Sequence, residues 1–163
     1  MQFLNYFFAS ILSFSGLLIG IMLVKIAPEE QKSLEKYFYL ARRGLLFIMI
    51  AFLFFYSPKD NFSVLTLIAS SLILFFIEFS NYEIQKKSML TYSIFGVLFF
   101  LSSRNINLFA VESSLILLYG LPTASLIYGT KKRNNYKLIF YNLGFVVILS
   151  ILFMLTTIFH SLS

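Results

Sequence analysis

Hydrophobic and polar residues alternate along the chain in long blocks, with six apolar runs separated by short polar connections. A helix needs about 20 apolar residues to cross the ~30 Å hydrocarbon core of a bilayer. The pattern therefore predicts an all-α fold, a polytopic integral membrane protein in which residues 1–163 form one six-helix transmembrane bundle domain. The predicted spans cover residues 3–26, 40–56, 62–79, 89–102, 108–128 and 138–160.

Two of the predicted spans, 40–56 and 89–102, are shorter than a bilayer requires. Arg42 and Arg43 lie at the start of the first of them, and long basic side chains near helix ends can extend into the headgroup layer. We expect both arginines to do so. Pro28 and the two glutamates after it are typical of a helix start, so an amphipathic helical segment is predicted to lead into this span.

Lysine and arginine are distributed unevenly among the connections. The first connection holds five, the third two and the fifth four, whereas the second and fourth hold only Lys59 and Arg104. Because short cytoplasmic loops are enriched in basic residues, the first, third and fifth connections are predicted to be cytoplasmic. An even number of spans then makes both termini extracytoplasmic, in a multi-pass protein of the cell membrane.

Composition limits the classes of partner and cofactor that we expect for this chain. Only 12% of the residues are charged, about half the share of an ordinary soluble domain. The net charge of +6 comes from the short connections and is interpreted as an orientation signal, so no nucleic acid is expected. Without cysteine and with one histidine, the chain is not expected to hold a metal or cofactor. The expected partners are the lipid bilayer and either a second copy of the chain or another membrane protein.

Small residues recur at helical spacing in two spans. Gly16 and Gly20 lie four residues apart in the first span, and Ser63, Thr66 and Ser70 form a similar stripe in the third. Small side chains allow helix backbones to approach closely inside a membrane. We interpret both stripes as helix-packing surfaces within the bundle, with a contact between subunits as the alternative for the glycines.

The fifth span carries the most unusual set of polar residues. Glu112, Tyr119 and Thr123 fall on one helical face, and Pro122 ends a Gly-Leu-Pro sequence that is expected to loosen the helix. A carboxylate near a broken helix could bind a solute or an ion, and His160 near the end of the sixth span could pair with it. The alternative is that Glu112, about 6 Å into its span, lies in the headgroup layer.

Two further polar residues are assigned simpler roles. Glu78 ends the third span, where Lys86 or Lys87 is expected to neutralise it. Asn142 lies one turn into the sixth span and is expected to form a hydrogen bond between helices.

Known catalytic patterns are missing from the sequence. Asp60 is the only aspartate, the Gly-x-Ser-x-Gly elbow is absent, and a single histidine cannot make a His-Glu-x-x-His motif. We therefore expect no enzymatic activity. The favoured interpretation is a non-catalytic structural or assembly component of a membrane complex. The alternative is a transporter or channel for small solutes or ions, with its site at the Gly-Leu-Pro break.

Overall fold

The structure is a computed structural model that describes residues 3–57, 59–130 and 135–162, excluding the side chains of residues 3, 32, 129–130, 135–138 and 155–162. All regular secondary structure in these ranges is helical. The helices are α1 (Phe3–Ile26), α2 (Glu30–Tyr56), α3 (Asn61–Phe79), α4 (Ile84–Ser102), α5 (Ile106–Thr130), α6 (Asn135–Asn142) and α7 (Gly144–Leu162).

Within the described residues, four helices are long and apolar enough to cross a membrane. The apolar segments are Leu4–Ile26, Ser33–Tyr56, Asn61–Phe79 and Ile106–Tyr128, in α1, α2, α3 and α5. A shorter apolar segment, Ile139–Met154, extends across the junction of α6 and α7. Many large apolar side chains lie on the surface, and contiguous exposed apolar area of this extent is typical of a protein that contacts lipid.

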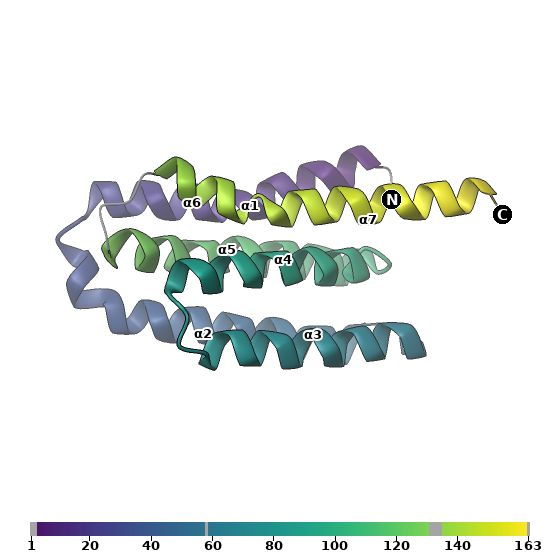
Figure 1. Ribbon diagram of the computed structural model, residues 1–163, viewed down its shortest axis with the longest axis horizontal. Helices are drawn as coiled ribbons and strands as arrows, with labels where there is room; N and C mark the ends of the chain where they lie inside the picture. The colour runs from purple at the N-terminus through teal and green to yellow at the C-terminus, as the bar shows by residue number, and fades with distance from the viewer. Residues whose placement is uncertain (1–2, 58, 131–134, 163) are drawn as a thin grey trace.

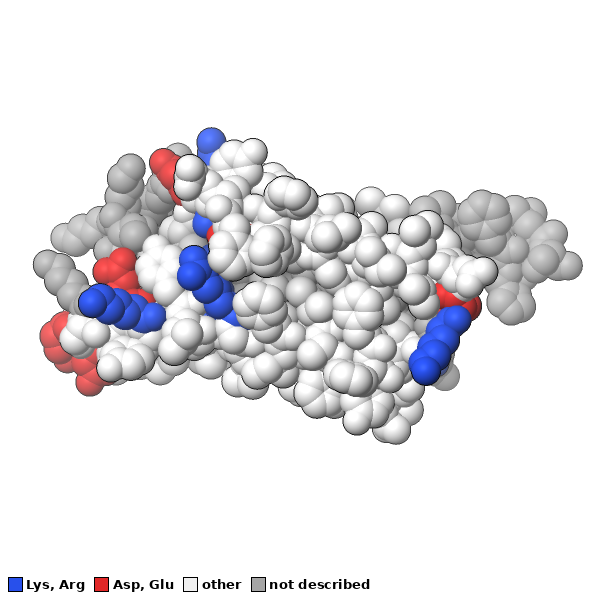
Figure 2. All heavy atoms as spheres, turned by 90° about the horizontal axis from the view of Figure 1, so that it is seen from below, with Lys and Arg blue, Asp and Glu red and all other residues white. Residues whose placement is uncertain are grey.

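The helices lie along a common long axis (Figure 1). The α1–α2 and α3–α4 connections share one end of the bundle, whereas the α2–α3 and α4–α5 connections share the other (Figure 1). We call the first the basic end, because lysine and arginine gather there on the face that Figure 2 shows. Between the two ends this face carries no charged side chain (Figure 2). Helix α5 packs against α1, α2 and α4 and is the centre of the bundle.

The helix bounds differ from the predicted spans in three places. Helix α2 begins at Glu30, so the amphipathic segment and the span at 40–56 form one continuous helix. Helix α4 begins five residues before the predicted span at 89–102. The predicted span at 138–160 is divided at Leu143, where the buried Asn142 accepts a hydrogen bond from the Ser88 hydroxyl of α4 at 2.8 Å. The predicted role of Asn142 between helices is confirmed.

Glycine allows α1 and α5 to make a backbone contact. A Cβ atom on Gly16 would collide with the carbonyl oxygen of Leu117, and one on Gly20 would lie 2.7 Å from the Cβ of Ala124. On the facing helix, a Cβ on Gly120 would lie 2.5 Å from the backbone nitrogen of Leu17. Because no side chain fits between the backbones, all three positions require glycine for this packing.

The polar stripe of α3 has a different arrangement. The Ser63 hydroxyl donates to Asp60 Oδ1 at 2.8 Å, and its amide donates to Asp60 Oδ2, so Ser63 belongs to the helix cap. Thr66 donates to the carbonyl of Phe62 within the helix, and Ser70 is buried. Of these residues, Ser63 and Ser70 lie on the buried face of α3.

Candidate functional site

Three helices bring a charged centre together near the basic end. Arg42 lies on α2, one turn before Leu46 on the face that packs into the bundle. Glu78 follows the buried residue Ile77 near the end of α3, and Tyr119 lies in the middle of α5. The three side chains are buried together, because each follows the apolar periodicity of its helix.

An ion pair and a hydrogen bond define the geometry of this centre. Arg42 Nη2 lies 3.0 Å from Glu78 Oε2, with only 1% and 4% of the two side chains exposed. Arg42 Nε donates to the Tyr119 hydroxyl at 2.7 Å, and its guanidinium carbon lies 5.5 Å from the centre of the tyrosine ring. The centre therefore joins α2, α3 and α5 through one arginine.

Two more basic residues contact Glu78 from the edge of the bundle. Arg43 Nε lies 3.2 Å from Glu78 Oε1, and its side chain is 45% exposed. Lys87 Nζ donates to the backbone carbonyl of Glu78 at 2.7 Å. The expected neutralisation of Glu78 by Lys86 or Lys87 is thus replaced by ion pairs with the two arginines. Two cations meet the carboxylate and a third binds the carbonyl of the same residue, so the centre carries a positive excess.

The expectation that both arginines extend into the headgroup layer is wrong for Arg42, which turns into the bundle. Its position in the sequence resembles that of Arg43, its neighbour. The distinguishing signal is the spacing of Arg42 to Leu46, Met49 and Leu53, which continues the buried face of α2. A buried arginine needs an acid, and the sequence offers Glu78 for this role.

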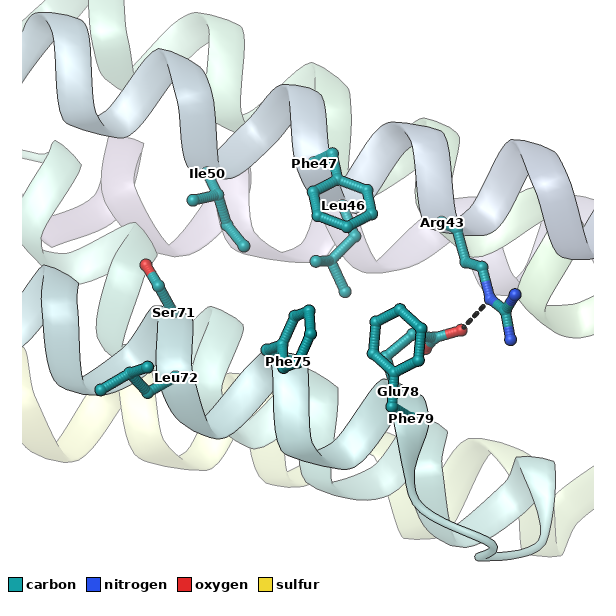
Figure 3. A pocket seen from close by; sticks show the side chains of 9 residues that line it. All are labelled: Arg43, Leu46, Phe47, Ile50, Ser71, Leu72, Phe75, Glu78 and Phe79. Atoms are coloured by element: carbon teal, nitrogen blue, oxygen red, sulfur yellow. Dashed lines mark hydrogen bonds and ion pairs between the residues drawn. The ribbon is translucent and has the colours of Figure 1, made fainter.

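A groove opens beside the charged centre, between α2 and α3 (Figure 3). Its volume is about 230 Å³. The walls are mainly apolar, with Arg43 and Glu78 at one end and Ile50 and Leu72 at the other (Figure 3). The hydroxyl of Ser71 donates to the carbonyl of Leu67, which leaves the polar pair at the end as the chemically distinctive part of the lining.

A second buried acid lies toward the opposite end of α5. Glu112 is seven residues before Tyr119, or about 10 Å along the helix, and is 2% exposed. Tyr6 on α1 and Ser102 on α4 are also buried polar residues of the bundle. Within the described residues, neither carboxyl oxygen of Glu112 nor the Tyr6 hydroxyl has a hydrogen-bond partner, while Ser102 donates to Phe99.

The candidate residues of the fifth span are therefore divided between two places. Tyr119 joins the charged centre, Thr123 donates to the Tyr119 carbonyl at 2.8 Å, and Glu112 lies apart from both. Pro122 is buried inside a continuous α5, so the Gly-Leu-Pro sequence does not interrupt the helix. The side chain of His160 lies outside the described residues.

The interactions seen at the charged centre are ion pairs and hydrogen bonds. Among the described residues, no three His, Cys, Asp or Glu side chains form a group that could hold a metal ion. Compared with protein families, curated proteins and solved structures, the chain has no match.

Proposed function

We propose that the chain is a six-span protein of the cell membrane that acts as a non-catalytic structural or assembly component of a membrane complex. The observation that carries this proposal is the pairing of Arg42 with Glu78. The two charges neutralise each other in a buried contact with Tyr119. They therefore hold helices together instead of lining a path for a solute. Ionisable residues that serve transport face a cavity or a pathway.

The surface of α2 and α3 supports a role in assembly. Phe55 is 80% exposed and Phe76 is 73% exposed, and other exposed aromatic side chains, including Phe47, Phe62 and Phe75, lie on the same two helices. Aromatic residues are enriched where proteins meet other proteins. In this proposal the two helices present a surface that a second copy of the chain or another membrane protein covers.

The proposed orientation has the basic end in the cytoplasm and both termini outside. Because the chain has no cysteine, single cysteines can be introduced without background. We expect Asn81→Cys, in the α3–α4 connection, to react with a membrane-impermeant maleimide only after cells are permeabilised. Asn105→Cys, in the α4–α5 connection, should react in intact cells. The reverse pattern, or reaction of both variants in intact cells, would contradict the topology.

The role in assembly can be tested with a photocrosslinking amino acid in the native membrane. At Phe76 on α3 we expect one discrete protein adduct. Met22 on α1 is 61% exposed and provides a matched control on a helix outside this surface, from which no such adduct is expected. Absence of any discrete adduct at Phe76 would remove the support for an assembly role.

A second function, transport of protons or small cations, is favoured by one observation: Glu112 is buried and its carboxyl oxygens have no hydrogen-bond partner among the described residues. Intramembrane acids commonly mark ion pathways. Purified protein in liposomes should show no flux of protons or monovalent cations if the assembly role is correct. Flux that Glu112→Gln abolishes, and that Asp60→Asn leaves intact, would replace the assembly role with transport.

A further inference from the structure

The groove between α2 and α3 combines an apolar cleft with a cationic end (Figure 3). From Arg43 to Ile50 its wall on α2 rises by seven residue steps, which corresponds to about 10 Å along the helix. Phe47 and Phe75 face the cleft from opposite helices (Figure 3). An unbranched hydrocarbon chain that enters alongside the helices fits a space of this length and lining.

At the cationic end of the groove, the guanidinium of Arg43 has N–H donors that can bind a further group. Only Nε of Arg43 meets Glu78, and Figure 3 shows the two terminal nitrogens turned away from the carboxylate. Within the described part of the chain, no residue bonds those nitrogens. Glu78 does not cancel Arg43, because Arg42 already neutralises that carboxylate from inside the bundle. Lys87 adds another positive charge on the backbone side of Glu78.

We propose that this groove binds one acyl chain of an anionic phospholipid, whose phosphate is held by the outward nitrogens of Arg43. The inference rests on the proposed insertion in a bilayer, with the basic end at a headgroup layer. A phosphate matches the fork of N–H donors on a guanidinium. Hydrocarbon alone gives little selection, because an acyl chain gains no hydrophobic energy on leaving other acyl chains. The charge therefore selects the lipid.

Native mass spectrometry of the purified protein with phosphatidylglycerol and phosphatidylcholine of identical acyl chains tests the selection. The wild type should retain the anionic lipid about fivefold better, the gain expected from one basic residue at an anionic headgroup. Arg43→Gln should bring the ratio close to one. Arg104→Gln removes an arginine of similar exposure, 49%, at the opposite end of the bundle and should leave the preference intact.

A second pair of variants tests the acyl-chain part of the groove. Ile50→Trp should fill the cleft and reduce retention of both lipids, whereas Ile48→Trp, at an exposed position of α2 outside the groove lining, should not. Glycerol phosphate, the soluble headgroup, should not compete. Equal retention of the two lipids by the wild type, competition by glycerol phosphate, or equal effects of the paired variants would overturn the proposal. So would a dimer that Ile50→Trp dissociates.

Failure of this inference is distinguishable from failure of the membrane topology. Maleimide labelling of Asn81→Cys in the Arg43→Gln background reports the orientation without reference to lipid binding. Unchanged labelling together with loss of the lipid preference is the expected combination.

Discussion

Glu78 and Glu112 are both acids inside the helix bundle, yet their surroundings differ in almost every respect. Glu78 is joined to Arg42 at 3.0 Å and to Arg43 at 3.2 Å, near the end of α3. Glu112 lies within α5 with no hydrogen-bond partner among the described residues. Through Arg42, the first acid joins three helices, whereas the second makes no hydrogen bond to another helix among the described residues.

Burial alone does not show which of the two acids stabilises the bundle. An isolated ionised carboxylate is costly to bury, whereas a paired carboxylate becomes part of a contact that is costly to break. The stability of the fold should therefore depend on Glu78 and Arg42 more than on Glu112, although Glu112 is the more conspicuous residue in the sequence.

Glu78→Gln should cause the largest loss of stability. It leaves the guanidinium of Arg42 buried without its counter-charge, which typically costs about 3–5 kcal/mol. The free energy of unfolding in mixed micelles provides the measurement. The double variant Arg42→Met with Glu78→Gln removes both charges and should recover a large part of the loss. A double variant less stable than Glu78→Gln alone would contradict the account of the centre.

Gly16→Ala should have the next largest effect. It introduces a Cβ where the carbonyl of Leu117 already lies, between Glu112 and Tyr119 on α5, and overpacking of this kind costs about 1–3 kcal/mol. The matched control is Gly44→Ala on α2, where an added Cβ would meet nothing within 4 Å. Because alanine favours a helix over glycine by about 1 kcal/mol, the control should be neutral or stabilising. Equal destabilisation by both variants would exclude a specific α1–α5 contact.

Parts of this architecture could be predicted from sequence and parts could not. Apolar periodicity is a local property, so the helices, the close approach at Gly16 and the interhelical role of Asn142 follow from short segments. Whether the side chain of Arg42 is buried or exposed depends on which helix faces it. Nothing near position 42 in the sequence identifies Glu78 or Tyr119 as its partners.

The predicted polar face and break of α5 also depend on contacts with neighbouring helices, which the local sequence does not specify. Spacing predicts Glu112 and Tyr119 on one face of the helix. Among the described residues, packing gives the Tyr119 hydroxyl a hydrogen bond with Arg42 and leaves the carboxyl group of Glu112 without one. Pro122 suggests a break because it lacks a donor, yet a buried helix can remain continuous when its neighbours hold it.

Glu112→Gln should be far milder than Glu78→Gln. The exchange preserves volume and breaks no ion pair with a described cation, so the change should stay below about 1.5 kcal/mol. Unfolding of the two glutamine variants in the same micelles compares the acids directly. A loss as large as that of Glu78→Gln would indicate that Glu112 has an ionic partner, and the contrast between the two regions would fail.

The smallest effect on stability is expected at Asp60, an acid that has hydrogen-bond and ion-pair partners but is exposed to solvent. Its pKa is held below the ordinary value of 3.8, first by the Ser63 hydroxyl and amide that donate to it and also by the charge of Arg104. A depressed pKa means that the folded state favours the ionised form. The resulting stability is therefore fully present above pH 3.8 and is lost as the pH falls through the lower pKa of the folded state.

Asp60→Asn can still accept a hydrogen bond at the cap but carries no charge. In a series of thermal unfolding midpoints, the advantage of the wild type over Asp60→Asn should shrink as the pH falls below 3.8. An advantage that does not change with pH would show that the cap does not depend on the ionised carboxylate.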